Sequence, residues 1–506
     1  RGLDSEPGMT SVEAEEDKKQ MRGVSAAIRA DLPDMVLLAT LYVFQGCITG
    51  LAFGSLPFIL VGRASYAQVG FFTFATYPYS CKLLWSPVVD SKYSRSFGRR
   101  KSWIVPMQIL MAVIMWSISW ISDHLVGLQG GPDVPKATFV FLILVTIAAT
   151  QDIAVDGWAL ELLSESNLAY AATCQTVGLN IGFFMSFTVF LALSSPDFAD
   201  TWIRSQPENT GLITLGGYLR FWAAATLILT AWLTVFKREG RRDSEGQGVP
   251  LVVGGQGGAA SMDQTSLRWV YTALWRTIRL PSMWTLLIVL SLSKVGFAAM
   301  DKLILLKLVE KGFKRDTLGI LSLIEFPFQI IFAMITGRWA SGDAPLAPWI
   351  RTYWCKLLLA PVGIVIVWMY SPDTYGFGAM VLGFMLLVAF ANNVMFTAMG
   401  SFFARIGDPA IGGSYLTLLN TISNLGGTWP QSVVLFAVEP LTFTHCPEGQ
   451  GPEKCEVIVD GFYVTNFICL GLGAGIGWFI LSSRVALIQK LAPADWRAFK
   501  RADDEV

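Results

Sequence analysis

The repetition of long apolar runs along the 506 residues is the feature that most constrains this chain. A bilayer core about 30 Å thick needs ~20 apolar residues per helix, and lipid admits only helices or closed barrels. The runs are rich in Phe, Leu, Ile and Val and show no strand-like alternation. They predict an all-α polytopic membrane protein with 12 transmembrane helices, at 35–60, 68–89, 103–122, 138–158, 168–194, 217–236, 283–304, 316–337, 351–370, 375–400, 411–436 and 461–482.

The composition agrees with a membrane protein and narrows its function. Hydrophobic residues make up 53% of the chain and charged residues 15%, against about 25% charged in a soluble domain. The net charge is +0, so no overall field attracts nucleic acid. The chain has no Gly-x4-Gly-Lys-Ser/Thr string and no zinc-type spacing of cysteines, so we expect neither a primary ATP pump nor a metal or other cofactor.

The connection between the sixth and seventh runs divides the chain into two equal sets of six. It is charged and then Gly-rich; a flexible linker is favoured over a phosphate loop, because no lysine follows the glycines. Its last part, "LRWVYTALWRTIRL", predicts a helix lying at the membrane interface. The expected organisation is a disordered tail (1–34), an N-terminal bundle (35–236), a linker with this helix (237–282), a C-terminal bundle (283–482) and a second tail (483–506).

Basic residues set the expected orientation. The second-to-third connection, the start of the linker (237–242) and the C-terminal tail each carry four or five Lys or Arg residues, whereas most opposite loops are poorer. Positive loops stay in the cytosol, so both termini are expected there. A group of four basic residues in the seventh-to-eighth loop is an exception: Lys307, Lys311, Lys314 and Arg315. Cys446 and Cys455 share one loop on the far side, where an oxidising lumen would allow a disulfide.

Charged residues inside apolar runs are expensive and point to function. Asp152 and Asp156 lie four residues apart, on one helix face near the cytosolic end of the fourth run. One interpretation pairs them with the basic 99–101 segment, which would fasten helix ends and gate the pore; the other makes them a proton or ligand site. Lys82, near the end of the second run, either reaches the interface or faces a cavity or Asp152.

The seventh and eighth runs each carry a charge at mid-depth. Lys294 lies roughly 16 Å into its run, and Glu325 reaches a similar depth in the next. They either form an ion pair, or Lys294 meets an anionic substrate. Asp301 and Lys302 are expected nearer the far rim. Asn180, Asn420 and Asn424 are further candidates to line a substrate path, although hydrogen bonds between helices explain most such residues.

Several of these segments together resemble the acetyl-coenzyme A transporters, a branch of the major facilitator superfamily related to bacterial muropeptide permeases. The resemblance covers nearly the whole membrane part. It rests on "LYVFQGCITGLAFGSLPFIL", "CKLLWSPVVDSKYSRSFGRRKSWIVP", "ATQDIAVDGWAL", "KVGFAAMDKLILLKLVEKG" and "IGGSYLTLLNTISNLGGTWP". Asp90, Gly98, Arg99 and Arg100 are similar to the superfamily's second-to-third loop signature, with a longer gap after Asp90 than the common form.

The resemblance implies a carrier in the endoplasmic reticulum membrane that moves cytosolic acetyl-CoA into the lumen, with exchange for CoA as a plausible mode. Depth and charge, not the resemblance, supply the expected site residues. These are, for substrate, Lys82, Lys294, Asn180, Asn420, Asn424 and Glu325, and for gating, Asp90, Arg99, Arg100, Asp152 and Asp156.

Other functions stay open at this point. A carrier of another anionic solute, such as a muropeptide, a folate or a nucleotide sugar, would have the same fold. A membrane acetyltransferase is disfavoured because both histidines, His124 and His445, fall in expected lumenal loops. The oligomeric state, including a homodimer, is not determined by the sequence.

Overall fold

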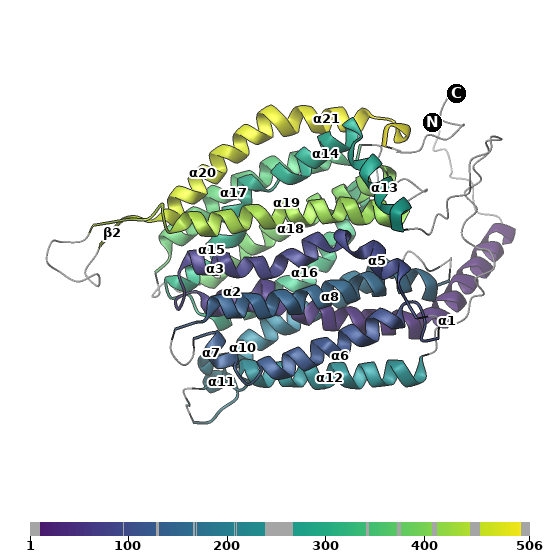
Figure 1. Cartoon of the computed structure of the whole chain (residues 1–506). Coiled ribbons are helices and arrows are strands. Elements are labelled where there is room, and N and C mark those ends of the chain that lie inside the picture. Colours follow the sequence, from purple (N-terminus) through teal and green to yellow (C-terminus); the bar gives the residue numbers. More distant parts are fainter. Residues whose placement is uncertain are drawn as a thin grey trace.

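The computed structural model describes residues 11–94, 96–127, 131–164, 167, 170–206, 208, 210–237, 267–340, 344–371, 376–406, 412–445 and 456–496. In these ranges the chain is helical apart from short connections and one two-stranded hairpin. The long helices lie side by side, with the N-terminal half in purple and blue and the C-terminal half in green and yellow (Figure 1).

The N-terminal half contains the segments expected to form the first six spans. Its elements are α1 (Ser11–Thr49), η1 (Gly50–Ser55), α2 (Leu56–Leu60), α3 (Tyr66–Phe72), η2 (Thr73–Thr76), α4 (Tyr77–Cys81), η3 (Lys82–Leu84), α5 (Ser86–Ser91), α6 (Lys101–Ile118), α7 (Ser122–Leu125), α8 (Val134–Leu162), α9 (Tyr170–Phe184), η5 (Met185–Val189), α10 (Phe190–Ser194), α11 (Pro196–Trp202) and α12 (Leu215–Phe236).

The C-terminal half repeats this plan after a helix that belongs to the linker. Its elements are α13 (Leu267–Ile278), α14 (Pro281–Leu292), η6 (Val295–Phe297), α15 (Ala298–Glu310), α16 (Arg315–Ala340), α17 (Leu346–Met369), α18 (Phe377–Ile406), α19 (Gly412–Val438), β1 (Phe443–His445), β2 (Glu456–Val459), α20 (Gly461–Ile476), η8 (Gly477–Leu481), α21 (Ser482–Lys490) and η9 (Pro493–Trp496).

Among the described residues, nine helical stretches are long and apolar enough to cross a membrane. They coincide with nine of the twelve expected runs. The other three runs correspond to the α3–α5 stretch, to α16 and to α19. The helix expected at the membrane interface coincides with α13. The expected disordered tail differs: from Ser11 onward it is helical and continuous with the first span.

Two expected spans are interrupted at a lysine. Lys82 begins the short 3-10 turn η3 between α4 and α5, and Pro78 and Pro87 lie at the starts of those two helices. Proline has no backbone N–H to continue a helix, which favours such breaks. Lys294 is the residue before η6, where α14 gives way to α15. Each break leaves backbone groups outside the regular helical ladder, beside a charged side chain.

Small residues allow the first and fifth spans to pack closely. A Cβ on Gly46 would lie 2.4 Å from the Leu179 carbonyl oxygen, and one on Gly182 would lie 2.1 Å from the Val43 carbonyl oxygen. Both positions therefore tolerate only glycine unless the backbones separate. Close approach through small residues is the usual way that helices associate in lipid.

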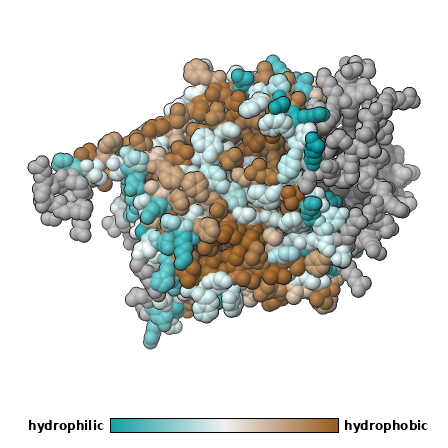
Figure 2. Space-filling view, in the orientation of Figure 1, coloured by the Kyte–Doolittle hydropathy of each residue, from teal (hydrophilic) through white to brown (hydrophobic). Residues whose placement is uncertain are grey.

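The two ends of the bundle differ in character. At one end, which we call the basic end, the Ser164 backbone N–H donates to Asp31 at 2.9 Å, Lys237 pairs with Asp34, and Lys101 donates to the Lys237 carbonyl at 2.8 Å. The opposite end carries the β1–β2 hairpin, which projects from the bundle (Figure 1), and we call it the hairpin end. Figure 2 shows a broad apolar area between the two ends.

Candidate substrate pathway

The first cluster of charges joins the second and fourth spans in the N-terminal half. The Lys82 ammonium pairs with Asp152 of α8, and its Nζ lies 3.4 Å from Oδ2 of Asp156. The side chain of Asp152 is 2% exposed, whereas that of Asp156 is 37% exposed. Asp152 is thus the buried anchor of the lysine, and Asp156 is the partner that faces open space.

Two neutral side chains complete this cluster. The Tyr42 hydroxyl of α1 donates to Oδ1 of Asp156 at 2.7 Å, and Nε2 of Gln175 in α9 donates to the same oxygen at 2.8 Å. Spans one, two, four and five therefore meet at a single carboxylate. Neither Tyr42 nor Gln175 was among the predicted site residues, because an uncharged polar residue in one apolar run does not reveal its partner in another.

The predicted gating residues divide into two groups. Asp152 and Asp156 pair with Lys82, so the expected pairing with the 99–101 segment is wrong. Arg100 instead contacts Asp90 at 2.7 Å and Glu161 at 2.8 Å. Glu161 was missed, although it lies one turn beyond Asp156 on α8. Arg99 donates to the Asp90 carbonyl at 3.0 Å and is only 3.9 Å from Glu161.

Backbone geometry places Arg100 in this network. Gly98 has a φ of 109°, which an L side chain rarely adopts, and this turn leads directly into α6. Gly157 of α8 leaves room for the guanidinium: a Cβ there would lie 2.3 Å from the Arg100 Cζ. Burial lowers the pKa of Arg100, but Glu161 and Asp90 more than offset it, so the pKa lies above its ordinary value and the group stays charged.

The two mid-depth charges of the C-terminal half do not pair with each other. Lys294 donates to the Ser423 carbonyl of α19 at 3.1 Å, and Glu325 of α16 accepts from Nε2 of Gln329 at 2.9 Å. Within the described part of the chain, no carboxylate lies within 4.0 Å of the Lys294 ammonium. The interpretation that Lys294 and Glu325 form an ion pair is therefore wrong.

A buried pair that the sequence analysis missed lies nearby. Lys356 of α17 contacts Asp301 of α15 at 2.6 Å and Oδ1 of Asn392 at 2.8 Å, and its side chain is 2% exposed. Asp301 thus anchors a buried cation instead of only marking a rim. The expected run began at 351, which placed Lys356 near the membrane surface, whereas α17 begins at Leu346 and puts it ten residues along the helix, about 15 Å from its start.

A cavity of about 450 Å³ opens beside this pair. Spans seven, eight, ten and eleven supply its lining, and half of the lining residues are polar. These are Asp301, Glu325, Gln329, Asn392, Asn393 and Gln431. A concave, partly apolar space with convergent polar groups is the usual form of a small-molecule site.

The three predicted asparagines lie on faces directed toward the opposite half. Asn420 and Asn424 are exposed on α19 and precede Thr428 by two turns and one turn; Thr428 contacts Ser80 of the N-terminal half at 3.1 Å. Asn180 is exposed on α9, one turn before Phe184, whose ring lies 5.4 Å from that of Phe326 in α16. All three are therefore positioned along the junction of the halves, where a substrate path would run.

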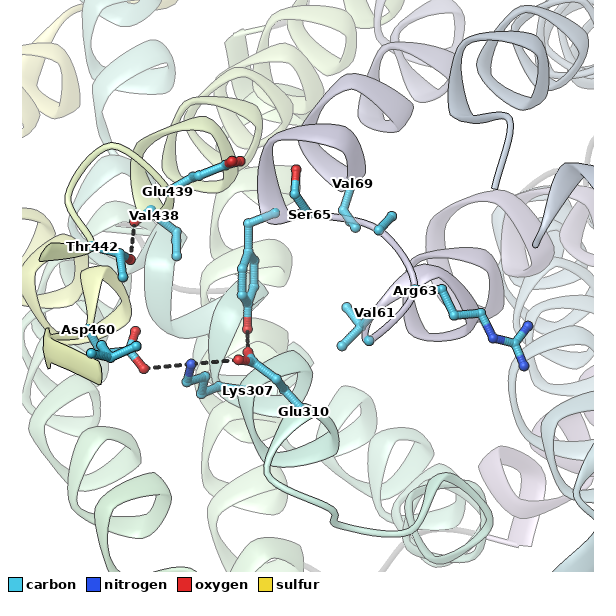
Figure 3. Close-up of a pocket in the computed structure, with 14 residues that line it drawn as sticks. Val61, Arg63, Ser65, Val69, Lys307, Glu310, Val438, Glu439, Thr442 and Asp460 are labelled. Atoms are coloured by element: carbon cyan, nitrogen blue, oxygen red, sulfur yellow. Dashed lines mark hydrogen bonds and ion pairs between the residues drawn. The ribbon is translucent and has the colours of Figure 1, made fainter. Parts of the chain in front are cut away.

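At the hairpin end, charged groups connect the two halves directly. Lys307 of α15 contacts Glu310 at 3.0 Å and Asp460 at 2.6 Å, and the Tyr66 hydroxyl of α3 donates to Glu310 (Figure 3). Ser65 positions the tyrosine, because it forms a reciprocal capping box with Gln68 at the start of α3. These groups border a cavity of about 440 Å³.

This cluster also accounts for the basic residues that were exceptional in the loop pattern. Besides Lys307, Lys311 donates to the Val367 carbonyl at 2.9 Å, and Arg315 donates to the Val61 carbonyl of the N-terminal half at 3.0 Å. Lys314 lies 3.2 Å from Asp197, also in the N-terminal half. Three of these four cations thus hold structural contacts at the hairpin end, and the fourth is an exposed pair. Cys446 and Cys455 lie outside the described residues.

Solved structures show which fold this arrangement represents. The D-xylose-proton symporter matches with a TM-score of 0.55 and 13% identity, over 88% of this chain and 97% of that one. The inward-open xylose transporter XylE of Escherichia coli gives 0.54 and 14%, over 89% and 96%. The nucleoside transporter NupG gives 0.53 and 12%, over 90% and 99%. The predicted major facilitator fold, with two six-helix bundles, is confirmed.

Sequence comparisons then identify the family. Residues 34–345 and 342–498 match the family described as acetyl-coenzyme A transporter 1. An uncharacterized membrane protein of Saccharomyces cerevisiae is 34% identical over 92% of this chain and 97% of its own length. The anhydromuropeptide permease of Escherichia coli is 26% identical over 34% of this chain and 33% of its own length. The chain belongs to the acetyl-coenzyme A transporter 1 family.

Proposed function

We propose that this protein carries acetyl-CoA from the cytosol into the lumen of the endoplasmic reticulum by alternating access of its two halves. The choice of acetyl-CoA as substrate rests on membership of the acetyl-coenzyme A transporter 1 family. The observation in the structure that supports it best is Lys294, a cation at a break in the seventh span with no carboxylate partner among the described residues. A polyanionic thioester supplies the phosphates that such a cation would bind.

The N-terminal cluster supports the same substrate in a different way. Lys82 is shared between two carboxylates, and its contact with the half-exposed Asp156 is the longer one, at 3.4 Å. A substrate phosphate can therefore replace Asp156 while Asp152 still neutralises the lysine. Binding would free Asp156 from Lys82 and leave it held by Tyr42 and Gln175, which gives the substrate a means of changing contacts between spans.

The distribution of contacts supports a conformation closed toward the hairpin end. There, Tyr66–Glu310 and Arg315–Val61 join the halves. At the basic end, the Asp90–Arg100–Glu161 network lies entirely within the N-terminal half, so it braces the ends of three helices without closing the path between the halves. In this proposal the basic end is cytosolic, both termini lie on that side, and the substrate enters there.

The experiment is uptake of labelled acetyl-CoA by proteoliposomes that contain the full chain, with and without CoA inside. We expect uptake above that of empty vesicles, and faster uptake with internal CoA if the mode is exchange. Uptake of a muropeptide, folate or nucleotide sugar without any uptake of acetyl-CoA would contradict the proposal and favour the alternative solutes. Whether the carrier works as a homodimer is a separate matter, which the size of the active species in those vesicles would show.

A further inference from the structure

The cavity in the C-terminal half is lined by amides and carboxylates, in contrast to the nearby cations Lys294 and Lys356. Its polar lining consists of four side-chain amides, Gln329, Asn392, Asn393 and Gln431, and two carboxylates, Asp301 and Glu325. Lys356 neutralises Asp301 at 2.6 Å, but the near contact of Glu325 is the neutral Gln329. The space therefore offers hydrogen-bond donors and acceptors, and its lining residues include no cation that could bind a phosphate group.

The amides retain donors and acceptors after their contacts within the chain. Asn392 accepts from Lys356 through Oδ1, which leaves its NH₂ group to donate. Asn393 donates to the Ala389 carbonyl at 3.0 Å, which leaves its own oxygen to accept. The Gln431 side chain has no hydrogen bond to another described residue, so it can do both. Secondary amides, with one N–H and one C=O each, match this set.

The apolar part of the lining fits the same kind of ligand. Met300, Leu305, Phe384, Met385 and Val388 supply thioether, aliphatic and aromatic surface between the amides. A slim chain that alternates methylene groups with amides would bury its carbon atoms on this surface and still pair its polar groups. An adenine nucleotide would bring phosphates into a space whose lining residues include no cation, and is therefore disfavoured.

We propose that this cavity is the subsite for the pantetheine arm of the substrate, and that the phosphates stay outside it, near Lys294. The inference rests on the proposed function and adds a division of the site by chemistry. The arm carries two amides and a hydroxyl, while the nucleotide part carries all the phosphates. Specificity for CoA thioesters over free nucleotides then comes from the amide-lined cavity. A free nucleotide lacks the arm, so it does not form the hydrogen bonds that the cavity offers.

The proposed separation of the arm site from the phosphate site is tested by measuring how two fragments of the ligand bind to the purified full chain. Pantetheine and adenosine 3′,5′-bisphosphate are titrated separately by calorimetry into the wild type, Gln431→Leu, Asn393→Leu and Gln489→Leu. Gln489 is a matched control, because it lies in α21 at the basic end, away from the cavity. We expect the Kd for pantetheine to rise about tenfold in the two cavity variants, the loss typical of one hydrogen bond, and the Kd for the bisphosphate to stay unchanged.

A further variant fills the cavity instead of removing a hydrogen-bonding group, and its bisphosphate affinity shows whether the protein is still folded. Ala389→Leu adds bulk to the cavity wall without removing a polar group. The helix propensity of leucine is close to that of alanine, so the helix itself is little affected. It should weaken pantetheine binding and spare the bisphosphate. Equal pantetheine affinity in wild type and all cavity variants overturns the subsite, as does a parallel loss of bisphosphate affinity. Failure of the proposed function gives a different result: vesicles that contain the wild-type protein then take up no acetyl-CoA, whatever the cavity variants bind.

Discussion

Lys82 and Asp152 form a buried ion pair that joins the break in the second span to the last third of the fourth. A charged pair inside a membrane bundle is retained only where its geometry is good, because both ions lose their water on burial. The aspartate has almost no exposed surface, yet the second carboxylate near the lysine, Asp156, is open to the path. The pair therefore combines a structural anchor with a position that substrate can reach.

Removing one member of this pair should cost more stability than removing both. Lys82→Met leaves Asp152 buried without its counter-ion, for which losses of about 3–5 kcal/mol are typical. Lys82→Met combined with Asp152→Asn leaves no unpaired charge, so its melting temperature should return toward that of the wild type. Uptake of acetyl-CoA should stay lost in both. A double variant less stable than Lys82→Met would show that the pair is not the source of the loss.

Adding one methyl group at Gly157 should disturb the Arg100 network. A Cβ there overlaps the guanidinium, at 2.3 Å from Cζ, so Gly157→Ala forces Arg100 away from Asp90 and Glu161. We expect a loss of about 1–3 kcal/mol in the free energy of unfolding, as for other overpacked sites, and slower uptake. Gly475→Ala is the control, because a Cβ there meets nothing within 4 Å and alanine favours the helix. Equal behaviour of the two variants would exclude the steric explanation.

Neutralising Glu310 should loosen the hairpin end. Glu310→Gln weakens the contacts to Lys307 and to Tyr66 of the other half, so this end should open more often. A cysteine at Val69, which is 0% exposed and borders the cavity of Figure 3, reports the opening through its rate of reaction with a membrane-impermeant maleimide. We expect faster labelling in Glu310→Gln. Glu439→Gln, which alters another acidic residue of the same cavity, should label at the starting rate.

Removing the charge of Lys294 should impair transport more than folding. Its contact within the chain is one hydrogen bond to a carbonyl, at 3.1 Å, so Lys294→Ala leaves no buried carboxylate unpaired. We expect a small change in melting temperature and a large loss of acetyl-CoA uptake. Lys136→Ala, at an exposed position in the first turn of α8, controls for the general loss of a cation. Uptake at the wild-type rate in a well-expressed Lys294→Ala protein would remove this lysine from the site.

The lengths of the apolar runs predicted the spans because a helix in lipid must satisfy its own backbone and reach across a layer of fixed thickness. The same rule showed that Lys82, Lys294, Asp152 and Glu325 are unusual, since each charged side chain lies in an apolar run that crosses the lipid. These are properties of single segments, so a sequence is enough to reveal them. The expected start of α17, five residues late, shows the limit: it concealed Lys356.

Partners, by contrast, were decided by the tertiary structure. Depth along a helix does not state which way a side chain turns, and a rotation of one residue moves it by ~100° to a different neighbour. Hence Asp152 met Lys82 instead of the arginine-rich loop, Lys294 met the Ser423 carbonyl instead of Glu325, and Asp301 met Lys356. The sequence by itself determined how many helices cross the membrane and which charges are costly there. Only the packing of those helices decided which charges neutralise one another and whether a cation such as Lys294 is left without a carboxylate among the described residues.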